Sequence, residues 1–297
     1  MTTVGFIGLG AMGSQIAGRL LAAGHPVYGT NRTKAKAAEL IGRGLRWCDT
    51  PREVAEAAEV TFSMVTNDAA LRSVADGPDG FLAGLSRGAV HVDMSTVSLD
   101  VSCELAERAR GLGAEFLDAP VSGSVPAAKD GSLAIMAAGD EAAFRRVEPL
   151  LRELGSTVTY VGANGQALLL KFAVNISLGA QILALSEGVL LAERGGIDRE
   201  LAVRVIASSA VGSPAVRARG PLILDLPEQA WFDVTLMQKD IWLALDTGTF
   251  LDTPLPSARA VDRMLTRARE LHYEHRDIAA FFEVLRKTDI EFDGKRA

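Results

Sequence analysis

The stretch "VGFIGLGAMGSQIAGRLLAAG", residues 4–24, decides how the rest of the chain is interpreted. A short apolar run is followed by glycines at positions 8, 10 and 13, and then by apolar residues at helical spacing up to Gly24. This order predicts a strand, a tight turn and a helix. In such a turn the first glycine permits the sharp bend, the second lets a pyrophosphate approach the backbone, and the third lets helix and strand pack closely.

The turn therefore predicts a dinucleotide-binding fold, with the pyrophosphate at the helix N-terminus. The alternative is a simple strand-to-helix turn, because a bare glycine pattern is a weak signal. A second strand follows at the right distance, which favours dinucleotide binding. We expect the turn to contact the cofactor through Gly8, Leu9, Gly10, Ala11, Met12 and Gly13.

Strands and helices alternate through residues 1–162. Apolar runs typical of strands occupy residues 25–30, 60–65, 88–95, 114–120, 132–139 and 156–162. Helical patterns lie between them, for example at residues 34–44 and 99–113. This alternation predicts an α/β domain of the Rossmann type, with a parallel sheet covered on both faces.

After residue 162 the alternation of strands and helices ends, and the sequence shows only helical patterns. Residues 163–194 form one long, nearly continuous apolar helix, and residues 195–297 are also helical. Lys171, Asn175, Gln181 and Glu187 interrupt the apolar run, so we interpret it as an interdomain helix instead of a membrane span. The remainder is predicted to be an all-helical domain for substrate binding and oligomerisation.

Composition narrows the class of protein. Of the 297 residues, 48% are apolar and 23% are charged, as in globular proteins, and the formal net charge of −6 argues against a nucleic-acid partner. The two cysteines show no CxxC spacing, and no basic segment precedes an apolar one at the start. We therefore expect a cytoplasmic protein in a reducing compartment. The four histidines form no ligand pattern, so no metal site is expected.

The residues after the second predicted strand bear on the choice of cofactor. An acidic residue there would bind the ribose of NAD, but this chain has Asn31 and Arg32. Arg32 offers a planar fork for a 2′-phosphate, and Thr33 and Lys36 add a hydroxyl and a second cation. The alternative is an ordinary solvated, basic helix start. We expect NADP(H), with NAD less favoured.

Three further groups of residues are candidates for the site, each with a plain structural alternative. Thr96 follows a strand, and we expect it either to contact the ligand or, as the structural alternative, to cap the next helix. The turn Ser122-Gly123-Ser124 exposes backbone N–H groups that suit a carboxylate, or is a plain turn. Lys171 and Asn175 share one helix face. A lysine in this apolar run is expected to have a catalytic or binding function, and the two structural alternatives are an ion pair and a side chain that extends to the surface.

Four motifs in order, "GFIGLGAMG", "DAPVSGS…DGSLAIMAAGD", "GQALLLKFAVN" and "QKDIWLAL", resemble the β-hydroxyacid dehydrogenases, and the resemblance covers nearly the whole chain. It implies that Lys171 is the catalytic acid/base and that Asn175 assists it at the substrate. It also implies substrate contacts from Ser122, Gly123, Ser124, Phe232 and Asp240, and cofactor contacts from Val65, Thr96 and Lys239. "NRTKAK", "KFAVN" and "FDVTLMQKD" look closest to the glyoxylate/succinic semialdehyde reductase branch.

The resemblance implies an NADP(H)-dependent enzyme that interconverts a small aldehyde- or keto-acid and its hydroxyacid, and that is a homodimer or homotetramer. Imine reductases share this architecture but commonly have Asp or Tyr where this chain has Lys171. A non-catalytic NADP-binding or scaffold protein is the other alternative. The bulky residues Trp231, Met237, Trp242 and Phe250 are candidates to line the pocket, which would count against a very small substrate.

Overall fold

Backbone contacts divide the computed structural model into two compact units, Met1–Lys171 and the chain from Phe172 onward. The structure describes residues 1–288. The division falls inside the long helix α9 (Gln166–Arg194), although the sequence pattern predicts residues 163–194 as a separate interdomain helix.

The first unit is built on one nine-stranded sheet, with the order β3-β2-β1-β4-β5-β6-β8-β7 and β9 paired to β8. The first six strands in this order, from β3 across to β6, are parallel to one another, so their carboxyl ends lie at one edge of the sheet. Polar loops that leave this edge are where α/β folds bind ligands. The strands are β1 (Val4–Ile7), β2 (Val27–Thr30), β3 (Arg46–Trp47), β4 (Val60–Ser63), β5 (Val90–Asp93), β6 (Glu115–Asp118), β7 (Val121–Ser122), β8 (Ala134–Ala138) and β9 (Thr157–Gly162).

The sheet differs in one respect from the predicted parallel sheet. Strand β8 is antiparallel to both β6 and β7, so the sheet is mostly parallel but mixed at this end. An apolar run predicts a buried strand but carries no signal for its direction. The two-residue strands β3 and β7 were not predicted, because two residues show no periodicity.

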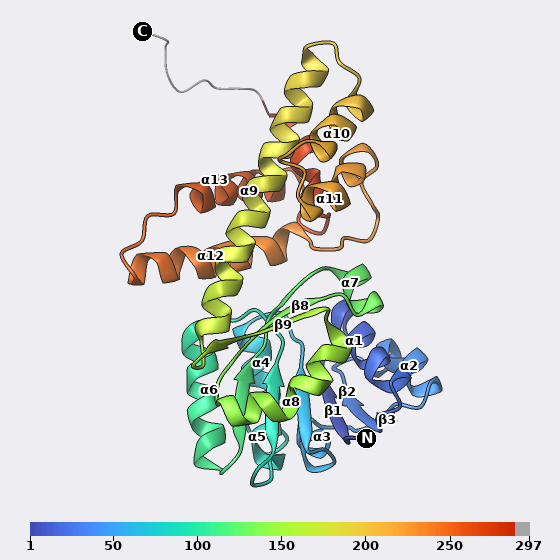
Figure 1. Ribbon diagram of the computed structural model, residues 1–297, viewed down its shortest axis with the longest axis vertical. Coiled ribbons are helices and arrows are strands. Elements are labelled where there is room, and N and C mark those ends of the chain that lie inside the picture. Colours follow the sequence, from blue (N-terminus) through green and yellow to red (C-terminus); the bar gives the residue numbers. More distant parts are fainter. Residues whose placement is uncertain (289–297) are drawn as a thin grey trace. The chain divides into compact units, whose positions relative to one another are not determined.

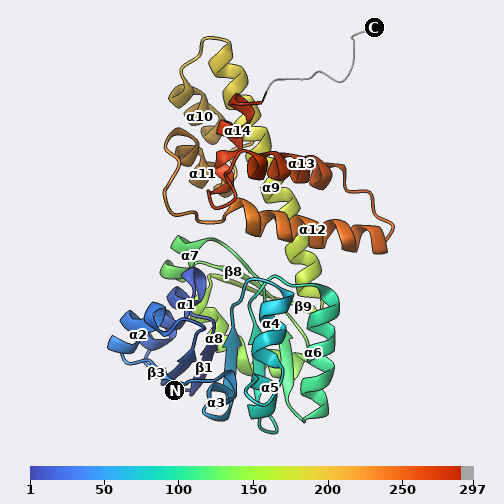
Figure 2. The same cartoon turned by 180° about the vertical axis from the view of Figure 1, so that it is seen from behind.

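Helices cover both faces of this sheet. Helices α1, α2 and α8 lie on one face (Figure 1), and α3, α4, α5 and α6 lie on the other, which Figure 2 shows in front. The predicted helix at 34–44 is a 3-10 helix, η1 (Lys34–Ala37), followed by α2. The helices are α1 (Ala11–Ala22), α2 (Ala38–Gly42), α3 (Pro51–Glu56), α4 (Asp68–Ala75), α5 (Phe81–Gly84), α6 (Leu99–Gly111), α7 (Val125–Asp130) and α8 (Glu141–Leu154).

The second unit is helical, as predicted. Helices α12 and α13 pack side by side (Figure 2), and buried apolar residues from α9, α12, α13 and α14 form one core. A Cβ atom at Gly179 would lie 2.7 Å from the Cε atom of Met237, so glycine allows α9 to approach α12 closely. The further elements are α10 (Arg199–Ser208), α11 (Pro214–Leu224), α12 (Val234–Phe250), α13 (Pro256–Glu270), the 3-10 helix η2 (Ile278–Ala280) and α14 (Phe281–Arg286).

Within the described residues, α9 is the one helix that is long and apolar enough to cross a membrane by length and composition. The core helices of soluble proteins pass the same test, and 44% of the apolar window in α9 is buried inside the structure.

Candidate active site

Three glycines shape the loop between β1 and α1. Gly8 has a φ of +95°, and a Cβ there would lie 2.3 Å from the carbonyl oxygen of Met64. A Cβ at Gly13 would lie 2.0 Å from the carbonyl oxygen of Gly8, so a side chain there would collide with the loop. A Cβ at Gly10 would meet no protein atom within 4 Å. The backbone of Gly10 is therefore open to an approaching group.

The N-terminus of α1 begins at this loop and favours an anion. Its first turn contains no acidic side chain, and no side chain caps it at Gly10. The first N–H groups of a helix lack helical partners and carry a partial positive charge. The loop from Gly8 to Gly13 therefore fits the pyrophosphate of a dinucleotide, with Ala11 and Met12 in the first turn.

Asn31 ties the loop after β2 to the glycine loop. Its Oδ1 accepts a hydrogen bond from the N–H of Leu9 (3.1 Å), and its Nδ2 donates to the carbonyl of Thr33 (3.0 Å). The sequence indicated the missing negative charge at Asn31 but not these bonds. Arg32, Thr33 and Lys36 are exposed, and the Thr33 side chain does not cap η1.

A buried polar chain joins the ends of β4 and β5. The Ser95 hydroxyl accepts from the N–H of Val65 (2.9 Å) and donates to Asp93 Oδ1 (2.7 Å), so it links the loops that carry Val65 and Thr96. The Ser63 hydroxyl donates to the same oxygen of Asp93 (2.6 Å) and lies 2.9 Å from His91 Nε2. Because Ser63 gives its only proton to Asp93, this network assigns the donating hydrogen of His91 to Nε2.

Burial sets the charge states of His91 and Asp93 in this hydrogen-bonded network. It lowers the pKa of His91 to about 3, so the ring is neutral, and the ring stacks on Phe81 with centroids 3.8 Å apart. Burial also raises the pKa of Asp93 to about 6, and the neighbouring carboxylate of Asp118 adds to the shift. Asp118 is the register partner of Asp93 on β6 and accepts from the N–H of Gly165 (3.0 Å). Neither Asp93 nor Asp118 was singled out from the sequence.

The predicted substrate turn follows a short strand and precedes a short helix. Ser122 is the last residue of β7, and Ser124 precedes α7 without capping it through its side chain. Gly123 has a φ of +121°, and a Cβ there would lie 2.8 Å from the Cβ of Ala127. The turn therefore requires glycine at position 123.

In the second unit, Asp240 binds two of the predicted site residues. Asn175 Nδ2 donates to Asp240 Oδ2 (2.6 Å), and Lys239 Nζ lies 2.6 Å from Asp240 Oδ1. Asn175 and Asp240 are buried, whereas the side chain of Lys239 is 22% exposed. Lys171 is also buried, and it lies one helical turn before Asn175 on α9. Asp240 therefore orients the Asn175 amide with its nitrogen toward the carboxylate.

Phe232 and the other bulky candidates occupy different environments. Phe232 lies just before α12, is partly buried and packs against the helical core. Met237 is completely buried in that core. Trp242 and Phe250 are 45% and 85% exposed. Among residues 1–288, no group of three or more His, Cys, Asp or Glu side chains is arranged to hold a metal ion.

Known proteins match both parts of the chain. Residues 3–162 match the NAD binding domain of 6-phosphogluconate dehydrogenase, and residues 164–285 match the NAD-binding domain of NADP-dependent 3-hydroxyisobutyrate dehydrogenase. Glyoxylate/succinic semialdehyde reductase 1 of Arabidopsis thaliana is 34% identical over 283 residues, which are 95% of this chain and 98% of that protein.

Two solved structures are similar over nearly their whole length. The 3-hydroxyisobutyrate dehydrogenase of Salmonella typhimurium has a TM-score of 0.88 and 30% identity, covering 96% of this chain and 100% of that one. Psf3, in complex with NADP+ and 2-OPP, has a TM-score of 0.89 and 29% identity, covering 95% of this chain and 100% of that one.

A sheet whose glycine loop fits a pyrophosphate, followed by a long helix that carries a buried lysine and asparagine, is the arrangement of a nicotinamide-dependent oxidoreductase. The matches to both units narrow this class, and the chain belongs to the β-hydroxyacid dehydrogenase family. It is an NAD(P)-dependent hydroxyacid dehydrogenase, and these relatives do not favour the imine reductase and scaffold alternatives.

Proposed function

We propose that this dehydrogenase uses NADP(H) to interconvert a short aldehyde- or keto-acid and its hydroxyacid. Support for NADP(H) comes from the loop after β2. No acidic side chain stands at its start, the amide of Asn31 is engaged by the glycine loop, and the guanidinium of Arg32 is exposed. A guanidinium there pairs with a 2′-phosphate, whereas an aspartate would repel it. The similar Psf3 structure contains NADP+.

Lys171 is proposed to provide the acid/base group. The nicotinamide, when bound, supplies or accepts the hydride. Charge develops on the substrate oxygen during reduction, and an ammonium group beside it stabilises that charge and donates the proton. In oxidation the neutral amine accepts the proton from the hydroxyl group. The support for this role is the family motif around Lys171 together with the burial of its side chain in the described structure.

Asn175 is proposed to orient the reacting groups, and Asp240 supports it. Because the Asn175 amide nitrogen donates to Asp240, the amide oxygen remains the acceptor end of the side chain. That oxygen can accept a hydrogen bond from the ammonium group of Lys171, which lies one helical turn away, or from a substrate hydroxyl. Phe232 is proposed to contact the apolar part of the substrate, and Ser122, Gly123 and Ser124 its carboxylate.

The same proposal includes cytoplasmic location and assembly as a homodimer or homotetramer. Support for assembly comes from large apolar side chains on the second unit that are strongly exposed in the single chain. They include Leu191 (76%), Val205 (55%), Val211 (71%) and Phe250 (85%). Burial of such residues against another copy would remove apolar surface from water.

Lys171→Met tests the proposed chemistry, because methionine keeps the chain length and removes the charge. We expect kcat with the best carbonyl acid to fall by roughly 10²–10⁴, the range for a positioned acid/base group. NADPH affinity should change little, because the glycine loop and Arg32 bind it. The exposed Lys129→Met serves as the control and should retain the parent kcat.

Steady-state kinetics, an NADPH titration and a melting curve distinguish the possible outcomes. A folded Lys171→Met that binds NADPH and turns over within about threefold of the parent would exclude the lysine as the acid/base group. Loss of thermal stability with kcat preserved would instead assign it a structural role.

A further inference from the structure

A buried carboxylate in the second unit binds the backbone N–H groups of two consecutive residues, Trp231 and Phe232. Asp277 is completely buried, and its Oδ2 accepts hydrogen bonds from the N–H groups of Trp231 and Phe232, both at 3.0 Å. Its Oδ1 accepts from the N–H of Ala279 (3.0 Å) and lies 3.7 Å from Nε of the buried Arg219. Asp277 lies 45 residues after Phe232 in the chain.

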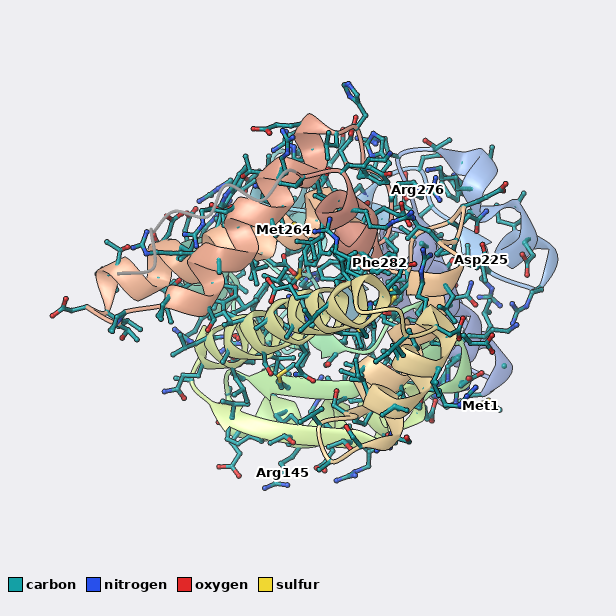
Figure 3. All side chains as sticks on the ribbon, turned by 90° about the horizontal axis from the view of Figure 1, so that it is seen from above. Met1, Arg145, Asp225, Met264, Arg276 and Phe282 are labelled. Atoms are coloured by element: carbon teal, nitrogen blue, oxygen red, sulfur yellow. The ribbon has the colours of Figure 1, made fainter. Side chains whose placement is uncertain are left out.

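Neighbouring residues add bonds in the same place. The N–H of Ile278 donates to the carbonyl of Phe232 (3.2 Å), and the N–H of Val234 donates to the carbonyl of Arg276 (3.0 Å). Both backbone polar groups of Phe232 are therefore bonded to residues 277 and 278. The Arg276 side chain, labelled in Figure 3, donates to the carbonyls at positions 226 and 227 (3.0 and 3.2 Å).

A carboxylate suits this position because of the number of donors that meet there. Three backbone N–H groups point at its two oxygens, and the nearby guanidinium balances its charge. Without Asp277, these N–H donors would lose their acceptor and the buried Arg219 guanidinium would lose an adjacent opposite charge, which is costly. The Phe232 side chain meanwhile packs against the helical core, so backbone and side chain together define one position for the ring.

We infer that Asp277 is a positioning residue for Phe232 and thereby sets which carbonyl acids the enzyme accepts. The inference rests on the proposed function, in which Phe232 contacts the substrate. Asp277 acts through the loop and does not touch the reacting atoms. Loss of this anchor leaves NADPH binding and the acid/base group intact but moves the apolar wall of the substrate site.

Asp277→Ala tests the inference, because alanine removes every acceptor. We expect KM for the carbonyl acid to rise about tenfold or more, since small displacements in a site are costly. The ratio of kcat/KM between glyoxylate and succinic semialdehyde should change as well, whereas KM for NADPH stays within about twofold of the parent value. If the single variant fails to fold, Arg219→Met/Asp277→Ala replaces it, because removing both charges leaves no unpaired ion.

Asp277→Asn separates positioning from stability. One amide oxygen can accept from both Trp231 and Phe232, while the charge balance with Arg219 is lost. We expect a lower Tm but a KM within about threefold of the parent value. Asp233→Asn is the control, because Asp233 caps α12 by accepting from the N–H of Leu236 (2.7 Å) and asparagine caps equally well. It should keep both the parent Tm and the parent KM.

Hydrogen exchange at the amides of Trp231 and Phe232 provides a readout that needs no turnover. Faster exchange in Asp277→Ala together with a raised substrate KM, both reversed in Asp277→Asn, would support the inference. Unchanged exchange, unchanged KM and selectivity, or a KM that follows Tm in all variants would overturn it. A parent enzyme that reduces no carbonyl acid would refute the proposed function instead, and exchange would then decide alone whether Asp277 holds the loop.

Discussion

Gly10→Ala should separate cofactor binding from folding. Gly10 has φ −79° and ψ −164°, a conformation that alanine adopts readily, and its new Cβ would meet no protein atom within 4 Å. Only the small difference between glycine and alanine at a helix N-cap remains, which is about 0.5–1 kcal/mol. The ligand-free variant should therefore melt close to the parent.

Cofactor binding should suffer, because the added methyl group occupies the surface that a pyrophosphate would approach. We expect the Kd for NADPH to rise at least about tenfold, equivalent to about 1.4 kcal/mol. Gly13→Ala is the matched comparison, because its Cβ would lie 2.0 Å from the Gly8 carbonyl oxygen. The backbone would have to move by about 1 Å or more to restore ordinary contact. That variant should be destabilised by about 1–3 kcal/mol before any ligand is added.

The assay is a melting curve without ligand, followed by an NADPH titration monitored by fluorescence. The reasoning fails if Gly10→Ala binds NADPH within about threefold of the parent. It also fails if Gly10→Ala melts as low as Gly13→Ala, because the glycine at position 10 would then be needed for the fold.

Two further predictions concern charge. Arg32→Ala should weaken NADPH binding by roughly ten- to a hundredfold and NADH binding far less, measured as separate Kd values, and equal losses would contradict a 2′-phosphate contact. Burial raises the pKa of Asp93 from 3.8 to about 6, so between these values the native state holds a proton that the unfolded chain has lost, and the free energy of unfolding falls as the pH rises. Asp93→Asn removes this titration, so the unfolding free energy of the variant minus that of the parent, measured in urea titrations, should increase by about 2–3 kcal/mol between about pH 4 and pH 7. His91, whose pKa is lowered to about 3, contributes with the opposite sign, but its contribution is common to both proteins and cancels in this difference.

The parts of the fold that could be predicted depend on local patterns. The β1–α1 turn and the long helix α9 each carry their signal within one continuous stretch, namely a glycine spacing and an apolar run. The antiparallel direction of β8 and the six-residue helix α7 could not be predicted in the same way. Strand direction depends on partners far away in the chain, and a helix of less than two turns shows little periodicity.

The residues of the candidate site likewise differ in whether a local sequence pattern reveals them. Lys171 and Asn175 stand out because charged and amide side chains interrupt one apolar helix at a spacing of one turn. The bond between Asn175 and Asp240 spans 65 residues, and the bonds from Ser95 and Ser63 to Asp93 join different strands. No local pattern pairs such residues, so their roles emerged only from the three-dimensional structure.

Three buried carboxylates, Asp93, Asp240 and Asp277, have a common physical role in the described structure. Each loses hydration on burial, and each recovers part of that cost by accepting hydrogen bonds from residues in or beside the predicted site. An apolar residue would fill the same volume at a lower desolvation cost, so net stability is a poor explanation for them. A carboxylate, unlike an apolar side chain, specifies direction: the acceptors determine where the loop of Val65, the amide of Asn175 and the backbone of Phe232 lie. We therefore interpret the desolvation cost of these groups as the energetic expense of positioning the site. This predicts that alanine variants, which lack the acceptor oxygens, alter KM and selectivity, whereas asparagine variants, which keep one acceptor oxygen, largely preserve both.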